Sequence, residues 1–272
     1  MYRQVTLPNG ARLLTEAMPG VRSAALGFFV GVGSRHEGAK ENGAAHFIEH
    51  MLFKGTRRRT AAQLAKDTDA IGGQFNAYTT KEHTCFYART LDSHLDQGLD
   101  ILEDMLFHSK FDPADTQLER GVILEEIGMY EDTPEDLVAE RLSAAVYKGS
   151  PLARPILGRA STLSGMEGDW LREWQRERYH AGVLVAALAG SFTRAQEERL
   201  TQLLASLPAG PLPKVRPAAY HGAVTVKRKA IEQNHLILAF PAPAYLDPRR
   251  PQVLLLNSLL GGGCSSRLFQ EL

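Results

Sequence analysis

The sequence predicts an α+β fold, in which helices cover a mixed or antiparallel sheet. Two segments, residues 4–16 and 74–90, each consist of two short strand-like runs about a turn, which is the pattern of a β-hairpin. Residues 24–32 are almost continuously apolar, so we expect a central strand buried on both faces. Helical patterns occur between and after these strand patterns, at residues 60–71, 92–107 and 114–130.

A proline-rich segment predicts how the chain is divided. Residues 207–217 contain four prolines in eleven residues, a composition typical of an interdomain linker. We expect residues 1–206 to form a complete first domain. Residues 218–272 partly repeat its opening pattern, with strand-like runs at 223–229 and 235–240 before a helix. The sequence therefore predicts one complete domain followed by an incomplete second copy.

Composition argues against several classes of partner. The 31 Lys and Arg residues balance 31 Asp and Glu residues, so neither nucleic acid nor an anionic membrane is expected to bind. The only compact basic run, residues 57–59, is interpreted as a solvated loop. No apolar run approaches the roughly 20 residues of a membrane span, and no signal peptide pattern opens the chain. Because Cys85 and Cys264 form no C-x-x-C pair, we expect a soluble protein of the reducing cytoplasm.

The first chemical motif is H-x-x-E-H, formed by His46, Glu49 and His50. In a helix, His50 lies about 40° round from His46, and Glu49 about 60° to the other side, so all three leave one face. Two imidazoles one turn apart suit zinc, and a neighbouring carboxylate suits a general base. An isolated His pair is more often a packing feature than a metal site. Here the apolar neighbours predict a buried helix, whose polar groups need partners.

A catalytic zinc site needs a third protein ligand, which we expect from the helix at residues 114–130. The candidates are Glu119, Glu125 and Glu126. Glu126 shares a row with apolar residues, whereas Glu125 lies in a row that looks exposed, so Glu126 is the favoured ligand. Glu119, two turns earlier on the same side, has two interpretations. It either reaches the site and contacts a metal ligand without binding the metal itself, or it is an ordinary exposed carboxylate. His180, before an apolar strand-like run, is expected to be structural.

Four motifs, in this order along the chain, resemble those of a known family. They are HFIEHMLFKGT, NAYTTKEHT, ERGVILEEIGMYEDTPED and LGGGCSSRLFQEL. Together they resemble the inverzincin zinc peptidases of the pitrilysin/insulinase type, family M16, and most of all its processing-peptidase-like bacterial branch. The likeness extends over all 272 residues. It implies an α+β domain that occurs twice per chain, the first copy catalytic and the second degenerate, closing round an unfolded peptide.

The resemblance also implies a role for each matched residue. The zinc ligands, for one ion per chain, fall on His46, His50 and Glu126. The general base falls on Glu49, and an auxiliary acidic residue falls on Glu119. The substrate-binding motif implies a strand whose free edge pairs with the peptide backbone, and it falls on Asn76, Ala77, Tyr78 and Thr79.

The expected activity is zinc-dependent hydrolysis of unfolded peptides, with Glu49 as the general base. Members of the family carry an Arg and a Tyr in the second domain, beyond the matched residues, that contact the substrate. We therefore expect this chain to bind zinc but to cleave poorly unless a complementary half is supplied; a homodimer is the other partner suggested. The alternative is a non-catalytic subunit of the family that binds peptides or holds an assembly together. It is disfavoured because such subunits lose ligand residues, and all four positions are filled here.

Overall fold

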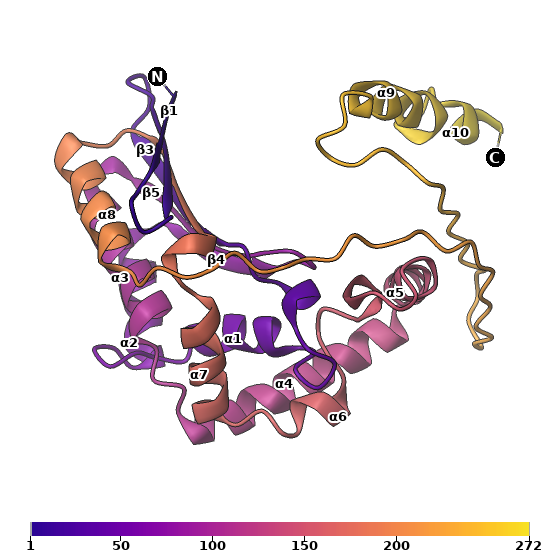
Figure 1. Ribbon diagram of the computed structural model, residues 1–272, viewed down its shortest axis with the longest axis horizontal. Coiled ribbons are helices and arrows are strands. Elements are labelled where there is room, and N and C mark those ends of the chain that lie inside the picture. The colour runs from indigo at the N-terminus through magenta and orange to yellow at the C-terminus, as the bar shows by residue number, and fades with distance from the viewer. Residues whose placement is uncertain (1, 272) are drawn as a thin grey trace. The chain divides into compact units, whose positions relative to one another are not determined.

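The computed structural model describes residues 2–271. Its first part contains a six-stranded mixed sheet (Figure 1). Its strand order is β1-β2-β6-β3-β5-β4. The strands are β1 (Tyr2–Thr6), β2 (Arg12–Ala17), β3 (Ser23–Val30), β4 (Gln74–Thr79), β5 (Thr84–Leu91) and β6 (Leu184–Gly190). Only β2 and β6 pair in parallel, whereas all other neighbours are antiparallel. Both predicted hairpins, β1–β2 and β4–β5, are confirmed.

Helices connect the strands of this sheet. They are α1 (Ala44–Leu52), α2 (Ala61–Ile71), α3 (Leu95–His108), α4 (Pro113–Asp132), α5 (Pro134–Val146), α6 (Ala160–Leu163), α7 (Gly168–Arg178) and α8 (Arg194–Ser206). Short 3-10 turns occur at η1 (Ser34–His36), η2 (Asp92–His94), η3 (Pro151–Ala153) and η4 (Ala181–Val183). The mixture of sheet and helices is the α+β class expected from the sequence.

Local chemistry explains where the helices begin. The Thr60 side chain accepts a hydrogen bond from the Gln63 backbone at the start of α2, as an N-cap residue does. At the start of α4 the Asp112 carboxylate accepts from the Ala114 backbone, and Pro113 occupies the first helical position, where its missing N–H costs nothing. These caps set the boundaries of α4, which carries two of the acidic residues predicted to serve the site.

The sheet buries one face much more fully than the other. Leu26, Phe28 and Val30 of β3 point into a core that also includes buried side chains of α1, α3, α7 and α8. On the opposite face of β3, Ala25 is exposed and Phe29 is half-buried. The expectation that this strand is buried on both faces was therefore wrong. Among residues 2–230, helices cover only one face of the sheet (Figure 1), and small residues such as Ala25 and Gly27 account for the apolar run.

The basic run at residues 57–59 is not simply a solvated loop. The Arg59 side chain is only 15% exposed, and its guanidinium pairs with the carboxylates of Asp67 and Asp104 at 2.9 and 2.6 Å. Asp104 on α3 is fully buried and also accepts a hydrogen bond from the Thr56 hydroxyl at 2.7 Å. Arg59 thus holds the loop after α1 against α2 and α3. The hydrophobic periodicity of the sequence does not predict these ion pairs.

Contacts divide the chain into two units, one ending at Ala230 and the other starting at Ile231. The second contains α9 (Arg250–Gly261) and α10 (Arg267–Glu271), which contact each other. Residues 223–229 and 235–240, predicted as strands, form no strand in the described chain. Their apolar side chains remain exposed, for example 95% for Val224 and 78% for Phe240. A strand requires a neighbouring strand to bind its backbone, and alternation alone supplies none.

No helix within residues 2–271 combines the length and the apolar character that crossing a bilayer requires.

Candidate metal centre

Helix α1 presents the three residues of the H-x-x-E-H motif beside the core. Ala44, Phe47, Ile48, Met51 and Leu52 are buried and fix the helix against its neighbours. The remaining side of the helix carries the two histidines and the glutamate, of which His46 is the most buried. The sequence therefore folds so that an apolar surface anchors the helix while its polar row faces α4 and the edge strand β4.

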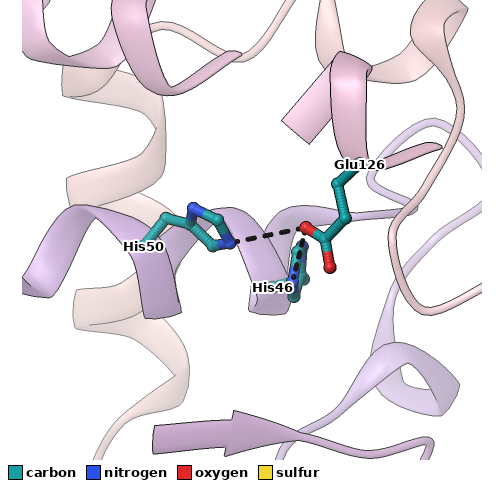
Figure 2. A group of neighbouring side chains, drawn as sticks. All are labelled: His46, His50 and Glu126. Carbon is teal, nitrogen blue, oxygen red and sulfur yellow. Dashed lines mark ion pairs between the residues drawn. The ribbon is translucent and has the colours of Figure 1, made fainter. Parts of the chain in front are cut away.

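His46, His50 and Glu126 converge although Glu126 comes from a distant helix. Figure 2 shows the Glu126 carboxylate reaching from α4 toward both imidazoles of α1. Its Oε2 atom lies 3.6 Å from His46 Nε2 and 3.7 Å from His50 Nε2. The two rings are 4.7 Å apart between centroids. Within residues 2–271, this is the one group of three His, Cys, Asp or Glu side chains that is arranged to hold a metal ion.

The donor set fits zinc. Two imidazole nitrogens and one carboxylate oxygen are the ligands of many catalytic zinc sites, which keep a fourth position open. Zinc bonds of about 2.0 to 2.1 Å in a tetrahedron place neighbouring ligand atoms about 3.3 Å apart. The observed separations of 3.6 and 3.7 Å lie a few tenths of an ångström above that value. All three ligand atoms lie within 4.8 Å of one another, so modest side-chain adjustments would bring them into the coordination sphere of one zinc ion.

Electrostatics keeps these donors available. Burial, and then the neighbouring His50, lowers the pKa of His46 to about 3, so its ring is neutral at physiological pH. Burial raises the pKa of the Glu126 carboxyl, and the nearby His50 opposes that rise. A neutral imidazole offers a lone pair, and a partly desolvated carboxylate gains from a cation. The site is therefore one in which a divalent cation relieves the cost of burying polar groups.

Glu119 lies behind His50. Its Oε2 atom is 3.1 Å from His50 Nδ1, and its Oε1 atom is 2.7 Å from Lys54 Nζ. With Nδ1 protonated, His50 donates to Glu119 and turns the lone pair of Nε2 toward Glu126. The Glu119 side chain is only 7% exposed. Glu119 is therefore buried and in contact with His50, and it is not an ordinary exposed carboxylate.

Glu49 contacts the edge strand. The Thr79 hydroxyl donates a hydrogen bond to the Glu49 carboxylate. Burial raises the pKa of Glu49, the Thr79 hydrogen bond opposes that rise, and His50 and Glu126 lie close enough to act on its charge. A partly buried carboxylate of raised pKa beside a metal site is a suitable general base. The sequence patterns did not show the link from Thr79 to Glu49.

The NAYT residues divide between the two faces of β4. Ala77 and Thr79 are half-buried on the side of the helices, whereas Asn76 and Tyr78 are exposed on the other. The structure thus brings Thr79 to Glu49 and leaves the Asn76 and Tyr78 side chains on the opposite face. In the described chain β4 is an outer strand that pairs only with β5, so its second edge has no strand partner.

Sequence reasoning missed two supporting residues. Lys54, which binds Glu119, lies just after the end of α1, so its four-residue spacing from His50 was a weak signal. Glu37, whose carboxylate accepts a hydrogen bond from the Ala45 backbone of α1, lies in a loop for which the sequence predicted no role. His180, expected to be structural, is buried and is not part of the metal-binding group among the described residues.

Comparisons with known proteins identify the family of the chain. Residues 12–160 match the family model of insulinase, peptidase family M16, and residues 167–272 match the model of the peptidase M16 inactive domain. The protein named "Uncharacterized zinc protease YmxG" of Bacillus subtilis (strain 168) is 41% identical over 272 residues. The one named "Uncharacterized zinc protease SCO5738" of Streptomyces coelicolor is 42% identical over 279 residues. The alignments cover 100% and 99% of this chain, but only 66% and 61% of those relatives.

Solved structures share the fold. A peptidase M16 inactive domain from Pseudomonas fluorescens superposes with a TM-score of 0.85 at 21% identity, covering 100% of this chain and 67% of that one. A protease from Helicobacter pylori gives a TM-score of 0.83 at 21% identity, covering 100% and 68%. At this identity the likeness concerns the fold, whereas the family model covers more than half of the sequence. The chain therefore belongs to the insulinase family of peptidases, family M16.

Proposed function

We propose that this chain carries the metal-binding half of a zinc-dependent endopeptidase that hydrolyses unfolded peptides. The observation that carries the proposal is the approach of Glu126 to both His46 and His50, with Glu49 on the same face of α1. Its relatives bear the name zinc protease. All four positions that the chemistry requires are filled, so this function is favoured over a non-catalytic subunit.

His46, His50 and Glu126 would hold the ion, one per chain. Zinc, when bound there, supplies Lewis acidity toward the attacking water and the peptide carbonyl. Glu49 accepts the proton of the attacking water and delivers it to the leaving amine, a role typically worth about 10²- to 10⁴-fold in rate. Thr79 holds the Glu49 carboxylate, and Glu119 holds the His50 ring.

The edge strand β4 offers a place for the peptide backbone. Its outer edge has no strand partner in the described chain, and its last residue, Thr79, contacts Glu49. A peptide added as a further strand would gain main-chain hydrogen bonds and lie beside the general base. A cavity of about 600 Å³ opens near Tyr130, one turn beyond Glu126 on α4. We propose that it receives a substrate side chain.

We also propose that efficient cleavage requires a complementary half. The chain spans less than two thirds of the length of the curated relatives that it matches. Residues 223–229 and 235–240 have the alternation of strands and keep large apolar side chains exposed, which is costly in water. A complementary segment that covers these residues would complete a second domain and enclose the peptide.

The proposal is tested by zinc analysis combined with peptide digestion. We expect one zinc per chain, retained in Glu49→Gln and lost in His50→Ala and Glu126→Gln. Glu125→Gln is the matched control, because Glu125 is exposed on the same helix and should keep zinc. Cleavage of an unstructured peptide is measured with and without the C-terminal third of a relative. Absence of zinc from the purified protein would exclude the proposed function, and near-normal cleavage by Glu49→Gln would exclude Glu49 as the base.

A further inference from the structure

Helix α1 starts at a residue that cannot cap it. Its N-cap is Gly43, with φ of +103°, a backbone conformation that favours glycine. A Cβ atom at this position would lie 2.9 Å from both the Gly158 Cα and the Leu157 carbonyl oxygen. Leu157 and Gly158 therefore leave no room at position 43 for the Ser, Thr, Asp or Asn side chain that usually caps a helix. The first N–H groups of α1 need an acceptor from elsewhere.

Glu37 supplies that acceptor from six residues upstream. Its Oε2 atom accepts a hydrogen bond from the Gly43 backbone N–H at 2.9 Å, and its Oε1 atom accepts from the Ala45 N–H at 2.9 Å. Glu37 is only 3% exposed, so these bonds are shielded from water. A carboxylate at this end of the helix also interacts favourably with the helix dipole. Ala45 directly precedes His46, so the Glu37 bonds act on the turn that carries the first predicted ligand.

A second set of contacts fixes Glu37 itself. The Asn42 side-chain amide donates to Glu37 Oε2 at 3.0 Å and to the Pro155 carbonyl at 2.8 Å. The Thr162 hydroxyl donates to the Asn42 carbonyl at 2.7 Å, and the Arg154 guanidinium donates to the Glu37 carbonyl. The start of α1 is therefore tied to the loop that leads into α6.

The two histidines are held in different ways. His50 is oriented by its own side-chain contact with Glu119. His46 Nδ1 is buried and has no hydrogen-bond partner within the described residues. The position of the His46 ring therefore depends on packing and on the placement of its backbone. The backbone at that point is held by Glu37 through the preceding residue, Ala45.

We propose that Glu37 is a positioning residue for the metal centre, which holds the first turn of α1 so that His46 stays within reach of His50 and Glu126. The inference rests on the proposed zinc site, and it assigns to Glu37 the task for His46 that Glu119 performs for His50. Glu37 touches neither the ion nor the substrate. Its effect on the site passes through the backbone of Gly43 and Ala45.

The test uses zinc affinity and a spectroscopic signature in the 272-residue chain. Glu37→Gln preserves shape but turns one accepting oxygen into an NH₂ donor that faces a backbone N–H. Competition with a chromophoric chelator at pH 8 should show zinc binding weakened by about tenfold or more. Substitution of residues that position metal ligands typically has an effect of this size. The visible spectrum of the Co²⁺-substituted protein should change, because the ligand geometry changes.

Glu41→Gln is the matched control. Glu41 lies in the same loop, and its side chain also accepts from a backbone N–H, that of Gly38 at 2.8 Å, and pairs with Arg178. Its side chain makes no hydrogen bond to the start of α1 among the described residues. We expect zinc affinity and the Co²⁺ spectrum to match those of the unsubstituted protein.

The outcomes separate this inference from the proposed function. If the unsubstituted chain binds no zinc, the proposed function fails whatever Glu37 does. If it binds zinc and Glu37→Gln has the same zinc affinity and Co²⁺ spectrum, the inference is overturned. This holds even if Glu37→Gln unfolds at a lower temperature than the unsubstituted protein. If Glu37→Gln does not fold, Asn42→Ala serves instead, since it keeps the carboxylate and cuts its tie to Pro155. A smaller loss of affinity supports the inference, and unchanged affinity overturns it.

Discussion

The Thr79 hydroxyl donates a hydrogen bond to the Glu49 carboxylate and so joins the edge strand β4 to helix α1. The strand proposed to receive the peptide and the residue proposed to accept the proton are therefore linked directly. Thr79 can also contact Thr84 on β5, whose hydroxyl donates to the Val32 carbonyl at 3.0 Å. A short polar chain thus runs from Glu49 into the sheet.

Thr79→Val should lower turnover and leave zinc binding within about twofold. The substitution removes a hydrogen bond to a charged group, worth about 1.5 to 3 kcal/mol, so we expect at least about a tenfold fall in kcat. Steady-state cleavage of an unstructured peptide, with the complementary segment present, measures the effect. Thr79→Ser keeps the hydroxyl and should restore most of the activity. Thr90→Val is the control, because the buried Thr90 hydroxyl has no hydrogen-bond partner among the described residues.

Glu119→Gln should weaken zinc binding by about 10- to 100-fold without removing a ligand. The amide is a poorer acceptor for His50 Nδ1–H, and it no longer neutralises Lys54. The zinc dissociation constant, from chelator competition at fixed pH, measures the loss. Glu131→Gln on the same helix is a suitable comparison, because Glu131 is exposed and its carboxylate makes no ion pair with His46 or His50 among residues 2–271. Equal affinities for the two variants would show that Glu119 does not orient His50.

Arg59→Met should destabilise the fold by about 3 kcal/mol. Removing one partner of a buried ion pair leaves the other charge uncompensated, which typically costs about 3 to 5 kcal/mol. The lower end is expected because Arg58 Nε remains 3.6 Å from Asp104 Oδ1. Urea denaturation at pH 7 measures the change. Arg57→Met, an exposed neighbour, should stay within about 0.5 kcal/mol of the unsubstituted protein. Similar midpoints for both variants would contradict a structural role of the buried pair.

The stability of the metal-free protein should depend on pH through Glu37. Burial raises the pKa of Glu37 from 4.5 to about 7, with opposing hydrogen bonds from Asn42, Ala45 and Gly43. The folded state therefore holds a proton that the unfolded state has released between these pH values. Stability gained from this proton is full below about pH 4.5 and is lost as pH rises toward 7. At about 1.4 kcal/mol per pH unit between pH 4.5 and about 7, the upper limit is about 3.5 kcal/mol.

The measurement is the difference in unfolding free energy between the unsubstituted protein and Glu37→Gln at several pH values. The other groups that act on Glu37, namely Glu41, Lys81 and Tyr179, are present in both proteins and largely cancel in the difference. We expect the unsubstituted protein to lose stability relative to the variant as pH rises from 4.5 to 7. A difference that is flat with pH would show that the Glu37 pKa is not raised.

The local elements were predictable because their causes are local. Alternating runs about a turn formed the β1–β2 and β4–β5 hairpins, and Thr60 and Asp112 capped helices where capping chemistry placed them. The spacing of His46 and His50 placed both rings on one side of α1. Each of these features depends on residues within a few positions of one another. The same reasoning was wrong for the strands predicted at residues 223–229 and 235–240, because a strand needs a partner strand that the local sequence does not supply.

By itself, the sequence determined the α+β class, the order of most elements and the placement of the two histidines on one side of α1. The helical rows also favoured Glu126 as the third residue of the group, but only the tertiary structure decided which other acidic and polar groups contact α1. Glu119 and Thr79 reach α1 from α4 and β4, Arg59 is buried by its pairing with Asp104, and Glu37 caps a helix whose own N-cap is glycine. The physical reason is that each contact joins residues through packing and desolvation between elements, and periodicity within one element carries no information about either.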